Sequence, residues 1–571
     1  MDKRFLLAIL LTAIVVMTVP RLFPTPPPRR PTVAAGDTLP VAAPPVGVAD
    51  TFTPPVAAPA VGGALGDTTQ AAAPGTESLV AVAESVTVTT PRLVYRFSTV
   101  GAIPVQITVP GYASLQHEGE RVQLARDGYP IIRFGLATNG DTLALDRMPF
   151  AVDSAPGTAT GVAPLTFRAP IGPAAEAVIR YTFAPDSYVV RVTGQVTGMP
   201  GSQILVTLAN GLRSEEADSL DDARNLAYVV KPVLDEPRSI AFAKTDTARG
   251  QTEQDGPYIW IASKNKYFLV ALLAPDSAQM FGTVRITPEA RAKRDVAKDV
   301  AATVSRPLGT DGAFAFELYT GPQEWRRLVA LGRDMGNVNP YGGWFKGVIQ
   351  PFATAVMRLL LWMHDQLRLS YGWVLVIFGI LVRIVLWPLN QGAMRSQLKL
   401  QALQPEMQAI QKKFGKDPQK QQEEIMSLYK RHGMSPMSPI LGCLPMLIPM
   451  PFLFALFFVF QNTIEFRGVP FLWLTDISQK DPYYILPILM GVSMFILSWI
   501  GLRNSPPNPQ AKMLAYLMPA MMTFFLLNLA SGLNLYYAVQ NIAAMPQQWL
   551  IARERAKSPM PTAAPAAVAK T

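Results

Sequence analysis

The sequence predicts a multi-domain protein in which an α-helical polytopic membrane bundle of six spans, five of them forming its core, is joined to an all-β sandwich domain. Only 16% of the residues are charged, and long apolar runs alternate with short polar segments after residue 340. Apolar runs of about 20 residues are long enough to cross a bilayer. Residues 76–320 instead contain short alternating runs separated by Gly, Pro, Asp and Asn, a pattern typical of antiparallel strands.

The first 75 residues are predicted to hold an anchor and a linker. An apolar run, residues 5–19, follows Lys3 and Arg4. We interpret residues 1–23 as a retained signal-anchor span because no small-residue cleavage site follows the run; a cleaved signal peptide is the alternative. Residues 24–75 form the linker, since residues 24–74 contain 12 prolines among Ala, Thr and Gly and offer little apolar area to bury.

Residues 76–338 are predicted to form the β-sandwich, which ends in a helix. Some of its strand candidates alternate in polarity, as half-buried strands do, and others are continuously apolar, as central strands are. The clearest candidates are residues 178–183, 188–192, 258–261, 267–273 and 314–319. A helix is expected over residues 323–335, directly after Pro322.

The rest of the chain is predicted to belong to the membrane. Residues 339–371 contain an amphipathic helix with aromatic residues on its apolar face, which suits the membrane interface; a helix that faces an ordinary core is the alternative. Residues 372–551 form a core of five further spans. Their expected limits are 372–390, 440–460, 484–501, 512–528 and 531–550.

The charges of the connecting segments predict the orientation. Residues 391–435 contain eight Lys or Arg and four Asp or Glu, and both 502–512 and the tail 552–571 are basic. Residues 461–482 contain two basic and three acidic residues. The positive-inside rule therefore places the basic segments in the cytoplasm. With six spans, both termini are cytoplasmic and the β domain lies outside.

Arg383 is a lone charge inside an apolar span. It lies roughly 9–10 Å from the cytoplasmic end of that span, at about 1.5 Å per residue. An arginine at this depth costs several kcal/mol unless water, a partner or snorkelling relieves it. One interpretation is a charge that faces a water-filled cavity open to the cytoplasm, since the other spans contain no acidic partner. Snorkelling to the headgroups is the alternative.

Polar residues of the later spans are candidates for the same cavity. Asn534, Tyr537 and Asn541 occur at i, i+3 and i+7 and therefore share one helix face. Thr523 and Gln461 are further candidates. Hydrogen bonding between helices is the alternative for each of these residues.

Residues 391–432 are predicted to form a cytoplasmic helical hairpin. Apolar residues recur at spacings of three and four along its first arm, and this stripe holds the two arms together. Four methionines follow where the hairpin re-enters the membrane. Their flexible thioethers suit a surface that recruits varied apolar segments, although filling a core is the commoner use. These candidate recruitment residues are Met434, Met437, Met446 and Met450.

The sequence contains no signature of an enzyme, a cofactor site or a metal site. H-E-x-x-H, a phosphate-binding glycine loop and G-x-S-x-G are all absent, and the three histidines fall in separate regions. The net charge of +10 has no nucleic-acid-binding motif beside it, so we expect no direct binding of nucleic acid. A channel or secondary transporter is the rival class, but no similarly interrupted pair of spans marks a solute path.

Four segments resemble the YidC/Oxa/Alb family of membrane protein insertases. They are V-R-I-V-L-W-P-L (382–389), L-Q-P-E-M (403–407), D-P-Y-Y-I-L-P-I-L-M-G (481–491) and S-G-L-N-L-Y-Y (531–537). The order of anchor, β domain, interfacial helix and five-span core resembles the Gram-negative form with a large periplasmic domain, which implies the bacterial inner membrane. The resemblance implies that nascent hydrophobic segments enter a hydrophilic groove around Arg383, with Tyr537 and its neighbour Tyr536 facing them.

The resemblance also implies partners and reveals one departure. The implied partners are nascent membrane proteins, the lipid bilayer, the Sec translocon, and the ribosome with the signal recognition particle pathway. A chaperone role in folding the inserted proteins is implied as well. Gly379 stands where the family often has a threonine, one turn before the arginine.

Overall fold

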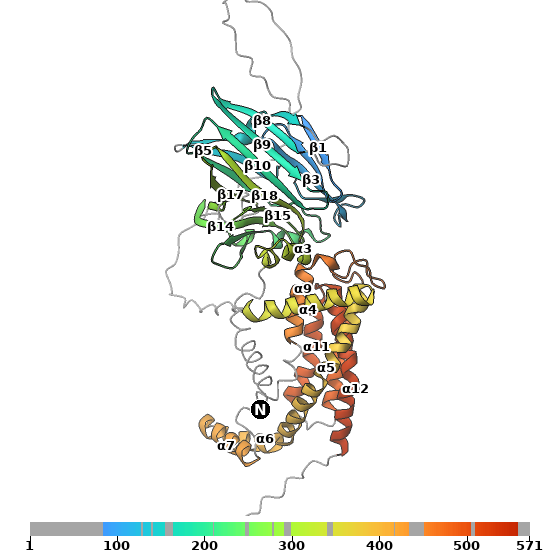
Figure 1. Ribbon diagram of the computed structural model, residues 1–571. Coiled ribbons are helices and arrows are strands. Elements are labelled where there is room, and N and C mark those ends of the chain that lie inside the picture. The colour runs from blue at the N-terminus through green and yellow to red at the C-terminus, as the bar shows by residue number, and fades with distance from the viewer. Residues whose placement is uncertain are drawn as a thin grey trace, which may run out of the picture. The chain divides into compact units, whose positions relative to one another are not determined.

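The computed structural model describes residues 84–126, 129–138, 141–154, 164–208, 211–245, 251–276, 279–289, 299–339, 346–415, 417–432, 450–503 and 509–557 (Figure 1). The predicted anchor and linker lie outside these ranges, and so do Met434, Met437 and Met446. Met450 and Gln461 are described by their backbone alone.

The described part of the β domain contains a 4-stranded and a 14-stranded antiparallel sheet. The small sheet has the order β1-β2-β3-β4, with β1 at Ser85–Thr89, β2 at Val94–Ser98, β3 at Ile103–Ala113 and β4 at Arg121–Gln123. The large sheet has the order β6-β5-β11-β17-β16-β14-β15-β18-β10-β9-β8-β7, and β12 and β13 pair beside β14. Its strands are β5 (Ile132–Thr138), β6 (Asp141–Leu143), β7 (Ala151–Ser154), β8 (Leu165–Gly172), β9 (Ala175–Phe183), β10 (Val189–Thr197), β11 (Gln203–Leu208), β12 (Ala227–Pro232), β13 (Arg238–Ala241), β14 (Thr252–Lys264), β15 (Phe268–Leu273), β16 (Phe281–Glu289), β17 (Asp299–Pro307) and β18 (Ala313–Pro322).

Aromatic side chains hold the layers of the sandwich together. Phe97 of β2 packs against Tyr181 of β9 with 4.7 Å between ring centroids, and the Tyr181 hydroxyl donates to the carbonyl of Ala102 at 2.7 Å. Within the large sheet, Phe134 of β5 and Phe316 of β18 lie 6.2 Å apart although many strands separate them in the sheet order. The large sheet therefore curls over onto itself, and the predicted sandwich is confirmed.

The helix predicted over residues 323–335 is wrong in length. A short helix, α3 (Trp325–Ala330), is followed by Gly332, Arg333 and Asp334, all of which have positive φ, and then by the single turn Met335–Asn337. Three successive left-handed residues end an α-helix, because right-handed helical geometry requires negative φ. The two short helices α2 (Ser219–Asn225) and α3 are the α-helices of the described part of this domain.

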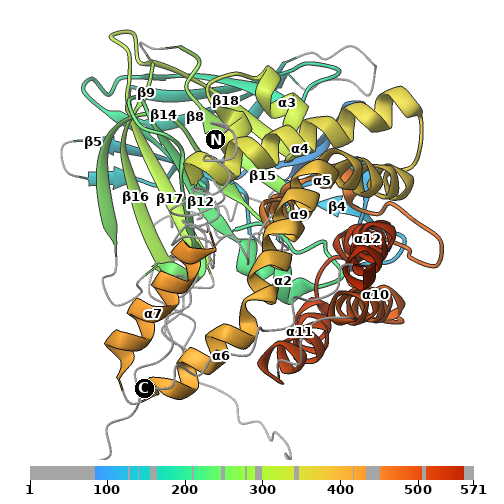
Figure 2. The ribbon, with the colours of Figure 1, turned by 90° about the horizontal axis from the view of Figure 1, so that it is seen from below.

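The C-terminal part is helical, and Figure 2 shows α10, α11 and α12 side by side. Helix α4 runs crosswise to α5 and α12 in Figure 1 and buries one face, including Ala353, Met357 and Leu360, against α9 and α5. The helices are α4 (Lys346–Leu367), α5 (Tyr371–Ala402), α6 (Gln404–Lys413), α7 (Pro418–Arg431), α9 (Met450–Asn462), α10 (Ile485–Leu502), α11 (Pro509–Leu526) and α12 (Ser531–Lys557).

Two helical segments of the described chain are long and apolar enough to cross a membrane. They are Tyr371–Pro388 and Ile485–Leu502, with mean hydropathy of 1.9 and 2.2, and Ala515–Leu526 is a shorter apolar stretch. Large apolar side chains of these helices face outward: Ile488 of α10 is 54% exposed and Phe524 of α11 is 76% exposed. Apolar surface of this kind is typical of contact with lipid or with another apolar partner.

The segment after the first of these spans differs from the simple hairpin expected from the sequence. Helix α5 continues without a break to Ala402, and α6 starts anew at Gln404 with Pro405 in its first turn. Proline has no N–H group to continue the preceding helix, so the helix restarts at this point. α6 and α7 then pack together, and the Tyr429 hydroxyl donates to the sulfur of Met407 at 3.4 Å.

Candidate functional site

Arg383 lies on α5 with its side chain half-buried against α12. Its Nη2 donates to Oε1 of Gln547 at 2.8 Å, and Nε2 of Gln547 donates to the carbonyl of Trp387 at 3.1 Å. Among the described residues no carboxylate pairs with Arg383, and its buried Nε has no hydrogen-bond partner. The positive charge is therefore held by a neutral amide and is not cancelled there.

A polar stripe on α12 faces α5. Gln540 donates to the hydroxyl of Tyr536 at 2.8 Å, and the Tyr536 ring lies 5.6 Å from that of Phe378. Tyr536, Gln540 and Gln547 occur at i, i+4 and i+11, a spacing that keeps them on one face of a helix with 3.6 residues per turn. Of these three residues only Tyr536 was predicted from the sequence as a site residue. Gln540 and Gln547 could have been found from the sequence, because they follow Tyr536 at spacings that place them on the same helix face.

Gly379 lets α5 and α12 approach each other closely. A Cβ atom at this position would lie 3.1 Å from Cγ1 of Val539 and 3.5 Å from the Tyr536 ring. Small residues allow helices in membranes to pack at such short distances. The departure noted at Gly379 is thus part of the contact between the two helices that carry Arg383 and Gln547.

Gly379→Thr is expected to destabilise the helical part by about 1–3 kcal/mol, the usual range for overpacking a filled contact. Threonine adds two more heavy atoms beyond a Cβ that is already tight, so α12 must move away from α5. Thermal unfolding of the purified protein in detergent would measure the loss. Gly347→Thr is the matched control, because a Cβ at Gly347 meets nothing within 4 Å. Equal melting of Gly379→Thr and the parent protein would contradict the close packing.

The other predicted residues of α12 turn toward different helices. Asn541 donates to Oγ of Ser493 at 3.2 Å and to the carbonyl of Met490 at 3.4 Å, both on α10. Asn534 is fully buried and donates to the carbonyl of Leu526 at the end of α11, at 3.1 Å. The structure therefore places these two amides in bonds between helices, the alternative that the sequence left open.

Among the described residues, Tyr537 and Thr523 also make no hydrogen bond to Arg383. The Tyr537 ring meets the Tyr536 ring edge-on at 5.5 Å, and its buried hydroxyl has no hydrogen-bond partner among the described residues. Thr523 donates to the carbonyl of Pro519 in its own helix at 2.7 Å. The structure thus brings Tyr536 to the α5 side of α12 but does not gather Asn534, Asn541 and Thr523 around the arginine.

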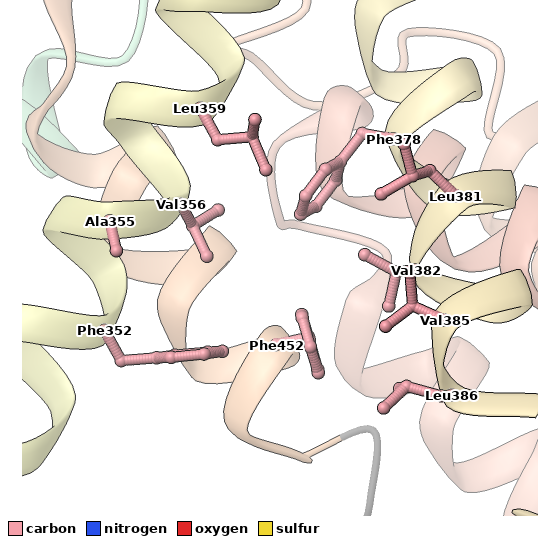
Figure 3. A pocket seen from close by; sticks show the side chains of 10 residues that line it. All are labelled: Phe352, Ala355, Val356, Leu359, Phe378, Leu381, Val382, Val385, Leu386 and Phe452. Carbon is pink, nitrogen blue, oxygen red and sulfur yellow. The ribbon is translucent and has the colours of Figure 1, made fainter. Parts of the chain in front are cut away.

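A separate cavity of about 240 Å³ lies among α4, α5 and α9. Figure 3 shows that apolar side chains alone line it, and that those of α5 come from successive turns of one face. Arg383 is not among them. The lining residues are Phe352, Ala355, Val356, Leu359, Phe378, Leu381, Val382, Val385, Leu386 and Phe452.

The fold and the site together define a class of protein. The described residues contain no group of three or more His, Cys, Asp and Glu side chains that could hold a metal ion. The helical part combines outward-facing apolar surface with an arginine whose charge is not cancelled by a described carboxylate. The chain is a membrane protein with a charged side chain, Arg383, inside an apolar helical bundle.

Comparison with known proteins identifies the family. Residues 362–558 match the model of the 60Kd inner membrane protein family, and residues 85–355 match that of the YidC periplasmic domain. The membrane protein insertase YidC of Chlorobaculum tepidum is 33% identical, with 65% of this chain and 64% of that protein aligned. Its counterparts in Chlorobium luteolum and Chlorobium limicola are 31% and 30% identical, with 68% and 70% of their lengths aligned to 68% and 71% of this chain. The chain belongs to the YidC family of membrane protein insertases, which are inner membrane proteins.

Similar solved structures include an active YidC insertase, 18% identical, which covers 81% of this chain and 92% of its own with a TM-score of 0.34. A galactose mutarotase-like protein from Lactobacillus casei is 10% identical and covers 42% of this chain and 100% of its own, with a TM-score of 0.28. Scores this low establish no common arrangement of the whole chains.

Proposed function

We propose that this protein inserts hydrophobic segments of nascent proteins into the inner membrane through a polar groove at Arg383, and that it assists their folding there. The observation that carries the proposal is the guanidinium held by Gln547 with no carboxylate beside it in the described bundle. Holding an uncancelled charge in a span costs several kcal/mol. A charge of this kind lowers the barrier for an oppositely charged substrate segment that must pass the same depth.

The proposed topology has six spans, with both termini in the cytoplasm and the β domain in the periplasm. The basic composition of 391–435 and 502–512 supports this orientation through the positive-inside rule. The proposed partners are nascent membrane proteins, the Sec translocon, and the ribosome with the signal recognition particle pathway. Recruitment by the methionines at 434, 437, 446 and 450 rests on the sequence pattern.

The proposal involves no covalent chemistry, so no catalytic residue and no cofactor is assigned. Within the groove, Arg383 supplies the charge and Tyr536 lies on the helix face beside it. Tyr537, on the neighbouring side of α12, is proposed to contact substrate segments from the side of α10 and α11. Its half-buried ring supports this role, as does its hydroxyl, which has no hydrogen-bond partner in the part of the chain that the structure describes.

A photo-crosslinking amino acid at position 537 is expected to capture a ribosome-stalled nascent chain whose first apolar segment has just emerged. Tyr537 is half-buried between helices, whereas Tyr129 lies on the β domain and is 49% exposed, so the same probe at position 129 is the matched control. Gel analysis of the crosslinked products would compare the two positions. Capture at 537 no greater than at 129, or equal capture of a soluble nascent chain, would contradict the proposal.

A further inference from the structure

Gln547 uses both ends of its side-chain amide. Its oxygen accepts from Nη2 of Arg383, and its nitrogen donates to the carbonyl of Trp387, one turn further along α5. The residue is only 2% exposed. Turning the amide over would set its NH₂ group against the guanidinium and its oxygen against a carbonyl oxygen. The pair of bonds therefore fixes the direction in which the amide oxygen points.

This arrangement also fixes the guanidinium. An arginine in a span has a long, flexible side chain that can snorkel toward the headgroups and leave the bundle. The bond to α12 opposes that movement. It occupies one terminal nitrogen, while the buried Nε has no partner among the described residues. A buried donor without a hydrogen bond raises the free energy of the folded protein, and an acceptor on a substrate segment would remove that cost.

The choice of a neutral partner has a consequence for the charge. A glutamate at position 547 would form an ion pair with Arg383, and such pairs are strong where the surroundings have a low dielectric constant. An ion pair would hold the guanidinium as well as glutamine does, but it would cancel the charge. Glutamine combines the two requirements, since an amide oxygen accepts a hydrogen bond from a cation and adds no charge.

We propose that Gln547 is a positioning residue for Arg383: it holds the guanidinium within the bundle by one terminal nitrogen and leaves its positive charge free for a carboxylate on the substrate. This inference rests on the proposed function. It assigns a role to a residue on the last helix that does not itself need to touch the substrate. The Gly379 contact brings the two helices close enough for the bond to form.

The test uses the full-length protein in proteoliposomes and two single-span substrates, one with an acidic translocated tail and one with a neutral tail of equal length. Gln547→Glu is expected to reduce insertion of the acidic-tail substrate about tenfold, because an ion pair cancels the positive charge. Gln547→Leu is expected to reduce it about threefold, because Arg383 loses the hydrogen bond that positions it. Neutral-tail insertion should stay within twofold of the parent protein for both variants, because a tail without carboxylates does not depend on the positive charge of Arg383. Protease protection of the tail measures insertion.

The matched control is Gln548→Leu. Gln548 is the next residue on α12, but its Nε2 lies beside Gly501 of α10 instead of α5. This variant should insert both substrates like the parent protein. Gln547→Glu keeps the size of the side chain, so it separates the loss of charge from a loss of packing. Protein abundance and melting temperature are compared for every variant.

A double-mutant cycle separates positioning from a purely structural role. In an Arg383→Ala background, Gln547→Leu should cause no further loss with the acidic-tail substrate, because the residue it positions is gone. A further loss of the same size in that background would overturn the positioning role. If Arg383→Ala lowers acidic-tail insertion but neither Gln547 variant does, only the positioning role fails. If Arg383→Ala has no effect, the proposed groove function fails, and the positioning role fails with it.

Discussion

Arg383→Ala is expected to reduce insertion of substrates with acidic translocated tails by tenfold or more, while purely apolar segments insert almost as before. Two or more unpaired carboxylates at membrane depth each cost about 2.5–3.5 kcal/mol, and an opposite charge at the same depth offsets part of that cost. An apolar segment has no charge for Arg383 to offset, so its insertion does not depend on the arginine. Reconstitution with both substrate classes, followed by protease protection of the translocated tail, measures the ratio.

Arg383→Lys is the control for charge alone. Lysine keeps the positive charge but lacks the planar fork of donors that guanidinium offers. A single ammonium donor still suffices for the one bond that Gln547 Oε1 accepts at this position. We therefore expect the Lys variant to retain most of the acidic-tail insertion. A loss as severe as that of Arg383→Ala would rule out an effect of charge alone, and equal insertion of both substrate classes by Arg383→Ala would rule out the groove.

Asp481→Ala is expected to lower the free energy of unfolding of the helical part by about 3 kcal/mol, within the range for leaving buried donors without an acceptor. Asp481 is fully buried just before α10. Its Oδ1 accepts from the backbone N–H of Tyr483 at 3.0 Å and from Nε1 of Trp473 at 3.2 Å. Its Oδ2 accepts from the N–H of Leu486 at 2.7 Å, in the first turn of the helix. The carboxylate also complements the positive end of the helix dipole.

Asp417→Ala is the matched control for Asp481→Ala. Asp417 caps α7 by accepting from the N–H of Lys420 at 3.2 Å, but its side chain is 45% exposed. Water replaces that bond, so the loss should be about 1 kcal/mol or less. Chemical unfolding in detergent, followed by tryptophan fluorescence, compares the two. Similar losses for both variants would show that burial at Asp481 contributes nothing beyond capping.

The strands could be predicted because the polarity pattern along each strand shows whether one face or both faces are buried. The continuous apolar run at 267–273 became β15, whose six residues are all buried between β14 and β18. The alternating run at 178–183 lies in β9, whose side chains alternate between buried and more exposed positions. The helix at 323–335 was predicted too long because composition did not reveal the left-handed backbone of Arg333 and Asp334. Those two residues take that conformation through their surroundings, since neither is glycine.

The candidate site divides in the same way. Hydropathy alone marked Arg383 as a charge in an apolar span, and helical spacing showed that Asn534, Tyr537 and Asn541 share a face. Spacing could not show which neighbour that face meets, and the structure turns its two asparagines toward α10 and α11.

The sequence by itself determined the two-part fold class, the strand runs and the lone arginine. Only the tertiary structure decided that this arginine meets Gln547, 164 residues away along the chain. Hydropathy and residue spacing indicate which face of its own helix a residue occupies. A contact between two helices depends on how closely they pack, and here the missing side chain of Gly379 sets that distance.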